Sequence, residues 1–75
     1  MNMNDLNKKQ IFIIFCLEGY IKTYQTTGAD TYNLFKKYAV FTYIEDGYDV
    51  LHTQSINYVI SEINDFIKNR KQYNG

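Results

Sequence analysis

The sequence contains no proline, a single cysteine and no excess of either charge. One cysteine cannot form an internal disulfide, which excludes a secreted disulfide scaffold and makes a reducing cytoplasm the simplest compartment. Eight basic and eight acidic side chains cancel, so the chain lacks the overall field expected of a nonspecific nucleic-acid or polyanion binder. No repeat or linker-like tract divides the 75 residues, which we interpret as one helical domain over residues 1–75.

Long hydrophobic runs are also absent, and the strongest one is the seven-residue IFIIFCL at Ile11 to Leu17. It is far shorter than the ~20 apolar residues that a membrane-spanning helix requires. Lys8 and Lys9 precede it, as in a signal peptide, but polar residues follow at once without a small-residue cleavage pattern. We therefore expect a buried helix and no membrane association.

Aromatic side chains are plentiful, with eight tyrosines and five phenylalanines. A chain this short buries only ~60% of its unfolded surface, so its core is small. Each aromatic side chain can bury ~150–250 Å², which suits a core made of few side chains. Some tyrosines must remain exposed, and exposed tyrosine favours binding to a partner.

Apolar residues at helical spacing predict a long helix at each end of the chain. The first runs from about Asp5 to Gln25, and its run Ile11–Leu17 is apolar around much of the helix. That favours a helix covered on several sides or by a second subunit. The last helix begins at a cap, Thr53 or Ser55. Its apolar stripe consists of Ile56, Ile60, Ile63 and Ile67, with Val59 and Phe66 beside them.

Two shorter helices are predicted between the long ones. Thr27 is the expected cap of a helix that runs to about Tyr38 and turns Thr31, Leu34, Phe35 and Tyr38 inward. A tight junction at residues 39–40 leads to a short helix over about residues 41–46. Gly47 suits the left-handed conformation that ends a helix. We expect Val50 and Leu51 to fold inward in a turn over Gly47–Thr53.

The predicted fold class is thus all-α, a compact bundle of about four helices of which the third is short. Residues 1–4 and 72–75 are expected to fray, because chain ends without buried contacts are poorly ordered.

No combination of residues predicts catalysis or metal binding. Cys16 and His52 are the only candidates for a nucleophile and base, but Cys16 lies in the most apolar segment, where a thiol is inert. One histidine and one cysteine cannot close a zinc site. Glu45, Asp46 and Asp49 lack the spacing of a calcium loop and suit a solvated helix end. We expect a protein that is not an enzyme and has no cofactor.

An alternative is a small helix-turn-helix DNA-binding regulator, because a helix ending near Tyr38 is followed by a tight turn and a second short helix. The second helix, however, would present Phe41, Thr42, Tyr43 and two acids, without lysine or arginine to meet phosphates. Nucleic-acid binding is therefore the less favoured prediction.

Protein contact is the favoured prediction, and it centres on the segment EDGYDVLHTQS. Aromatic residues beside charges are a common interface composition, although the same tyrosines could simply cover a small core. The candidate contact residues are Tyr43, Tyr48, Asp49, His52 and Tyr58. Self-association through the first or last helix is a further expectation, based on the apolar surface of Ile11 to Leu17.

Three stretches resemble a family of short bacterial proteins of unknown function: FIIFCLEGYIKTY, LFKKYAVFTYIEDGYDVLHTQS and YVISEINDFI. The resemblance covers about Lys9 to Arg70, and GYDVLHTQ is its most specific part. The family pattern has a glycine and an acid after threonine-glutamine, where this chain has Ser55 and Ile56, so the expected helix cap is weaker here.

The resemblance implies a small, all-helical, bacterial cytoplasmic domain with no assigned activity or catalytic residues. Relatives tend to lie beside genes for a second protein that resembles a toxin-like ADP-ribosyltransferase. This implies an antitoxin or accessory role, with the product of the adjacent gene as the partner protein.

Overall fold

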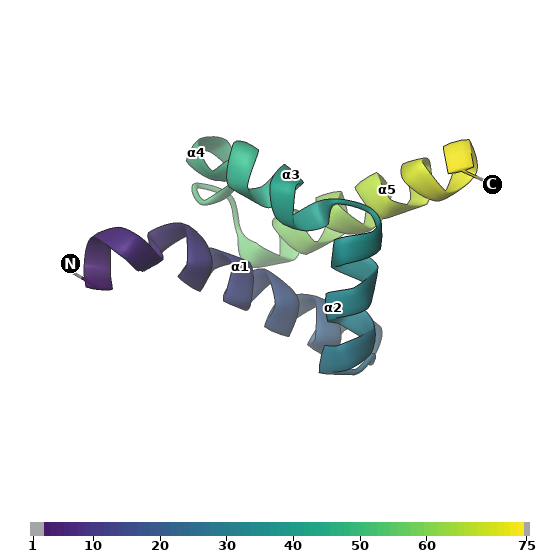
Figure 1. Cartoon of the computed structure of the whole chain (residues 1–75), viewed down its shortest axis with the longest axis horizontal. Coiled ribbons are helices and arrows are strands. Elements are labelled where there is room, and N and C mark those ends of the chain that lie inside the picture. Colours follow the sequence, from purple (N-terminus) through teal and green to yellow (C-terminus); the bar gives the residue numbers. More distant parts are fainter. Residues whose placement is uncertain (1–2, 75) are drawn as a thin grey trace.

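The computed structural model describes residues 3–74, with side chains for residues 8–72, as five helices (Figure 1). They are α1 (Met3–Tyr24), α2 (Gly28–Lys37), α3 (Val40–Asp46), α4 (Tyr48–Leu51) and α5 (Ile56–Asn74). No strand occurs in the described residues, which confirms the all-α prediction. The bundle of about four helices is also confirmed in outline. The additional element is α4, a single helical turn inside the segment Gly47–Thr53 that the sequence predicted as a turn.

The two long helices form the frame of the molecule, and α1 packs against α2, α3 and α5. In Figure 1 α2 stands across the C-terminal end of α1, while α3 and α4 lie above α1 in this view. The N-terminal part of α1 and the C-terminal part of α5 extend in opposite directions. The molecule is accordingly elongated, with extents of 42 × 23 × 22 Å.

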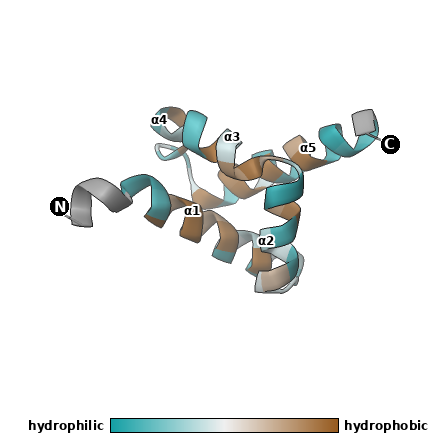
Figure 2. Ribbon diagram, viewed as in Figure 1, coloured by the Kyte–Doolittle hydropathy of each residue, from teal (hydrophilic) through white to brown (hydrophobic). Residues whose placement is uncertain are grey.

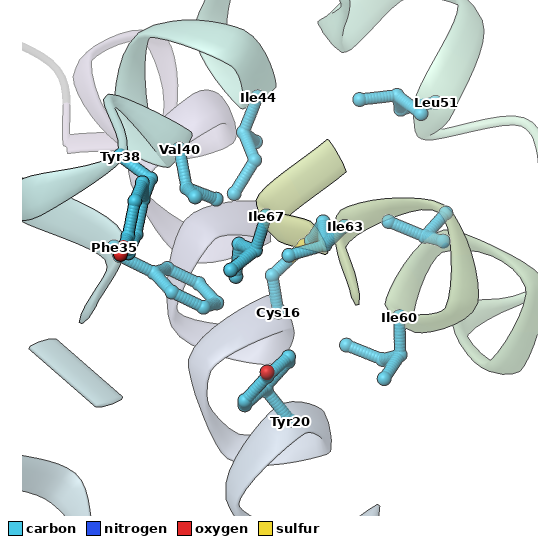
Figure 3. Close-up of a cluster of buried hydrophobic side chains, with 11 residues drawn as sticks. Cys16, Tyr20, Phe35, Tyr38, Val40, Ile44, Leu51, Ile60, Ile63 and Ile67 are labelled. Carbon is cyan, nitrogen blue, oxygen red and sulfur yellow. The ribbon is translucent and has the colours of Figure 1, made fainter. Parts of the chain in front are cut away.

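The core lies where the helices meet, and its side chains come from every helix (Figure 3). Cys16 of α1, Phe35 of α2 and Ile44 of α3 are fully buried there. The predicted stripe of α5 is confirmed at its centre, where Val59, Ile60, Ile63 and Ile67 are buried. Brown and teal segments alternate along the helices in Figure 2, as expected of amphipathic helices that share one core.

Two polar side chains enter this apolar region. The hydroxyl of Tyr20 donates a hydrogen bond of 3.1 Å to Oδ1 of Asn64, which links α1 to α5. Thr31 is fully buried, and its hydroxyl has no hydrogen-bond partner in the described part of the chain. Leaving a buried hydroxyl without a partner costs free energy, so Thr31 is a weak point of the core.

Side-chain caps start α2 and α5. Oγ1 of Thr27 accepts a hydrogen bond of 3.1 Å from the backbone N–H of Asp30, which confirms Thr27 as the cap of α2. Oγ of Ser55 accepts one of 3.2 Å from the N–H of Tyr58. Ser55 is therefore the cap of α5, whereas the Thr53 hydroxyl donates to the Val50 carbonyl at 2.7 Å.

The expectation of a left-handed Gly47 is wrong. Gly47 has φ −94° and ψ 7°, which any residue can adopt. Its lack of a side chain matters for packing, because a Cβ there would lie 3.1 Å from Cδ1 of Leu51 and 3.2 Å from the Tyr43 carbonyl oxygen. The left-handed residues are Gln25 (φ 53°) and Ala39 (φ 59°), which follow the ends of α1 and α2.

Two expectations about burial are half right. Leu51 folds inward and is 8% exposed, but Val50 points outward and is 67% exposed. In the apolar run of α1, Cys16 is buried, whereas Ile11 and Phe15 are about half exposed. The run is thus covered on only one side by the rest of the chain. Of the ends expected to fray, residues 1, 2 and 75 lie outside the described residues, and fraying stays a prediction.

Candidate functional site

An open groove of about 600 Å³ separates α1 from the start of α5. Phe12 and Phe15 of α1 and Ile56 of α5 supply its apolar surface, and Gly19 lets the two helices approach at its floor. Glu18, Lys22, His52 and Gln54 complete the lining. We call this hollow the α1–α5 groove. Apolar side chains rimmed by polar ones are the composition of a surface that receives a partner.

A second hollow of about 270 Å³ continues the groove toward the N-terminal part of α1. It is lined by Lys8, Ile11, Phe12, Phe15 and Tyr48. Both hollows share Phe12 and Phe15, so one apolar surface runs along α1 past the corner formed by α4 and the start of α5.

Tyr48 and His52 form the wall of that corner. Their rings are stacked, with centroids 4.5 Å apart and planes at 9°. The Nδ1 atom of His52 lies 2.7 Å from the Tyr48 carbonyl oxygen, which fixes the imidazole on the last turn of α4. Phe12 meets the Tyr48 ring edge-on at 5.6 Å, and the ammonium of Lys9 lies 5.9 Å from the same ring. The hydrogen bond between His52 and Tyr48 joins residues four apart and so spans one helical turn.

Tyr43 and Tyr58 lie on a different face, formed by α3 and the outer side of α5. The ring of Tyr43 stacks on Phe66 at 4.3 Å, and the guanidinium of Arg70 lies 4.8 Å from the Phe66 ring. Tyr58 is half exposed. Hydrogen bonding with the Glu62 carboxylate and its negative charge raise the pKa of the Tyr58 hydroxyl. Desolvation by burial, and secondarily Glu62, raise the pKa of Tyr43.

The five predicted contact residues therefore do not form one surface. Tyr48 and His52 flank the apolar surface on α1, with Asp49 exposed beside them. Tyr43 and Tyr58 share the other face with Glu62. The contact role of all five stays a prediction. Sequence reasoning did not select Phe12, Phe15 and Ile56, which provide the apolar lining of the α1–α5 groove. The available signal was the aromatic pair inside the apolar run IFIIFCL.

The thiol of Cys16 is enclosed by the core, and desolvation raises its pKa from 9.0 to about 12. It is protonated at neutral pH and inaccessible to a substrate, while His52 is exposed on the surface. Within residues 8–72 no group of three or more histidine, cysteine, aspartate or glutamate side chains is placed to hold a metal ion. Glu45, Asp46 and Asp49 are all exposed.

Among the described helices, none combines the length and the apolar content needed to cross a membrane. The longest, α1, carries its apolar run between polar segments.

These features define a small all-helical domain with an apolar groove on its surface. The family model described as "Protein of unknown function (DUF3791)" matches residues 11–70. The match covers more than half of the chain, and the chain belongs to this family. It includes all of α2, α3 and α4, both walls of the α1–α5 groove and the Tyr48–His52 corner. Comparisons with curated proteins and with solved structures found no match.

Proposed function

We propose that this chain is a non-enzymatic helical module that binds a partner protein in the bacterial cytoplasm, as an antitoxin or accessory protein. The partner is the product of the adjacent gene, as the resemblance to relatives beside toxin-like genes suggests. The observation that carries the proposal is the α1–α5 groove, where Phe15 and Ile56 are exposed and the partly buried Phe12 lies beside them in the lining.

The shape of the α1–α5 groove suits a helix or a loop of the partner protein that carries large apolar side chains. Amphipathic helices bind in grooves by inserting anchors spaced three or four residues apart. The rim carries Glu18, Lys22 and the His52 ring, and polar rims around an apolar centre are typical of specific interfaces. Since the buried Cys16 leaves no accessible nucleophile of the cysteine type, the groove is better suited to recognition than to catalysis.

The alternative, a helix-turn-helix regulator, has one feature in its favour. α2 and α3 are joined by only Tyr38 and Ala39, and the left-handed Ala39 makes the turn tight. The side chains that α3 exposes are Thr42, Glu45 and Asp46, and two of these three would repel DNA phosphates. A gel shift with the promoter of its own operon tests this alternative, and it is rejected if random DNA is retarded equally at the same salt concentration.

Co-expression with the adjacent gene product, followed by pull-down, tests the proposed function. The wild-type chain should retain the product and should relieve any growth inhibition that the product causes. Ile56→Asp should weaken retention at least tenfold, because it puts a charge into the groove wall. Aspartate in the first turn of α5 also suits the helix dipole, so the fold should persist.

The matched control is Tyr32→Asp, an exposed aromatic residue on α2 that does not line the groove. It should retain the partner like wild type. The proposal fails if the folded wild-type chain binds neither neighbouring gene product, or if both variants bind equally well.

A further inference from the structure

One face of α1 carries a stripe of exposed residues that has the spacing of a helix-pairing surface. The stripe consists of Lys8, Ile11, Phe15, Glu18 and Lys22, with successive separations of three, four, three and four residues. This alternation is the spacing with which two helices pack along each other. Ile11 is 47% and Phe15 55% exposed, so the apolar centre of the stripe is uncovered. We call it the α1 stripe.

Neighbouring elements leave this stripe open. The opposite face of α1 carries the buried residues Cys16 and Tyr20, and α2 and α5 pack on α1 at that face. Ile14, 51% exposed, widens the apolar centre on the solvent side. The middle of α1 is correspondingly brown, and therefore hydrophobic, in Figure 2.

Within the stripe, Lys8 and Glu18 carry opposite charges on either side of the apolar centre, at equal distances from position 13. Lys8 lies five residues before position 13 and Glu18 five residues after it, while Ile11 and Phe15 lie two residues before and after. Consider a second copy placed antiparallel to the first by a two-fold axis at position 13. Lys8 of each copy then faces Glu18 of the other, and Ile11 of each copy faces Phe15 of the other. Residues 8–18 of the stripe are therefore self-complementary in both charge and hydrophobicity, as an isologous interface requires, while Lys22 lies beyond this segment.

We propose that two copies of this chain pair through the α1 stripe, with their α1 helices antiparallel. The apolar centre formed by Ile11, Ile14 and Phe15 becomes buried between the copies, and two Lys8–Glu18 pairs flank it. A parallel arrangement would bring Lys8 against Lys8 and Glu18 against Glu18, so the charges select the antiparallel one. This inference does not depend on the proposed partner protein, although Phe15, Glu18 and Lys22 also line the α1–α5 groove. Its test variants alter Lys8, Phe15 and Glu18, whereas the partner test alters Ile56, and the two tests share the control Tyr32→Asp.

The first experiment measures the mass of the full chain by sedimentation equilibrium over a range of concentrations up to about 500 µM, because a short interface of this kind binds weakly. The expected result is association from 8.9 kDa to twice that mass. Phe15→Asp should remain monomeric, while the control Tyr32→Asp, which alters an aromatic of similar exposure on α2, should associate like wild type.

The second experiment exchanges charges between copies. Lys8→Glu alone places two carboxylates opposite each other at both ends of the interface, and Glu18→Lys alone places two ammonium groups opposite each other there. Each single variant should therefore associate at least about tenfold more weakly than wild type. An equimolar mixture of the two variants should form a heterodimer, because each end of its interface then pairs one acid of the first copy with one base of the second.

The antiparallel register fixes which side chains face each other in this heterodimer. In the heterodimer, the carboxylate introduced by Lys8→Glu faces the ammonium introduced by Glu18→Lys, and the native Glu18 of the first copy faces the native Lys8 of the second. Both cross-pairs are again of opposite sign, so the affinity should return to near that of wild type.

Circular dichroism of each variant establishes that α1 is intact, since Glu18→Lys also puts a like charge four residues from Lys22. A wild-type chain that stays monomeric at the highest concentration overturns the proposal. So does a Phe15→Asp variant that associates normally, or a mixture of folded single variants that associates no better than either alone.

Discussion

The α-carbon of Gly19 on α1 lies against Ile60 on α5, so that a Cβ at Gly19 would sit 3.1 Å from both Cδ1 and Cγ1 of that isoleucine. This approach sets the spacing of the two long helices at the floor of the α1–α5 groove. Ile56 Cγ1, at 3.5 Å from the same position, completes the contact. The glycine is needed for space, because its backbone is helical.

Gly19→Val should therefore destabilise the fold by about 1–3 kcal/mol, since a branched side chain must enter an occupied volume. Gly19→Ala is the graded comparison: a helix-propensity gain of about 1 kcal/mol offsets part of its smaller clash. Urea denaturation gives both free energies of unfolding. A Gly19→Val midpoint at or above wild type would show that α5 can move away from α1 without cost.

Ala39→Gly should stabilise the protein by about 1 kcal/mol, because Ala39 has a left-handed backbone (φ 59°) that glycine adopts without steric cost. The same exchange at Ala29, in the first turn of α2, should destabilise it by about 0.5–1 kcal/mol. Thermal unfolding of both variants measures the difference. Equal effects of the two substitutions would show that the left-handed backbone of Ala39, at the junction between α2 and α3, is not strained.

Thr31→Val should also be stabilising, by about 1 kcal/mol, because it replaces a fully buried hydroxyl that lacks a partner with a methyl group of similar size. Thr42→Val, at an exposed position of α3, is the matched control and should change little. A loss of stability for Thr31→Val in urea denaturation would indicate that the hydroxyl is hydrogen-bonded in solution.

Cys16 should resist alkylation in the native protein and react quickly in denaturant, since its thiol is buried and its pKa is raised to about 12. From pH 9.0 to about 12 the unfolded chain loses the thiol proton while the folded chain keeps it. The thiol's contribution to stability is full below this window and is lost as the pH rises through it.

Cys16→Ala removes that titration, so its free energy of unfolding should fall less steeply than that of wild type over the same alkaline range. The difference between the two slopes isolates the contribution of Cys16, because the tyrosines and lysines that titrate in both proteins contribute equally to each slope. Rapid labelling of native Cys16 at neutral pH, at a rate that exceeds unfolding, would be incompatible with its position in the core.

His52→Ala should lower the free energy of unfolding by about 0.5–1 kcal/mol, because it removes the contact with the Tyr48 carbonyl and the stacking on the Tyr48 ring. Gln54→Ala, exposed in the same connection, serves as the control for melting only, because Gln54 also lines the α1–α5 groove. Melting temperatures and partner retention are measured together. Unchanged melting with lost retention would make His52 a contact residue instead of a structural one.

Features that depend on neighbouring residues were predictable from sequence. The Thr27 cap follows from a hydroxyl placed three residues before the backbone N–H that it accepts from. The apolar stripe of α5 follows from residues three and four apart. The left-handed residue was assigned to Gly47 because glycine adopts that conformation most easily. Ala39 takes it instead, since the packing of α2 and α3 against one core fixes the angle at their junction.

The candidate site was only partly predictable, because tertiary packing decides which residues share a face of the molecule. Tyr43 and Tyr48 are five residues apart, yet Tyr43 stacks on α5 and Tyr48 packs on α1. The corner between α3 and α4 separates them, and that corner depends on the inward turn of Leu51. Of Val50 and Leu51, which are adjacent and both apolar, only Leu51 meets the core; their composition could not distinguish them.

By itself the sequence determined that this chain forms helices, where most of them begin, and which stripe of α5 is apolar, because these depend on interactions a few residues apart. Only the tertiary structure decided which side of the run Ile11–Leu17 is covered. The run is apolar around most of the helix, so periodicity cannot assign its faces. The docking of α2 and α5 buries Cys16 and leaves Ile11, Ile14 and Phe15 exposed on the side of α1 that carries the α1 stripe.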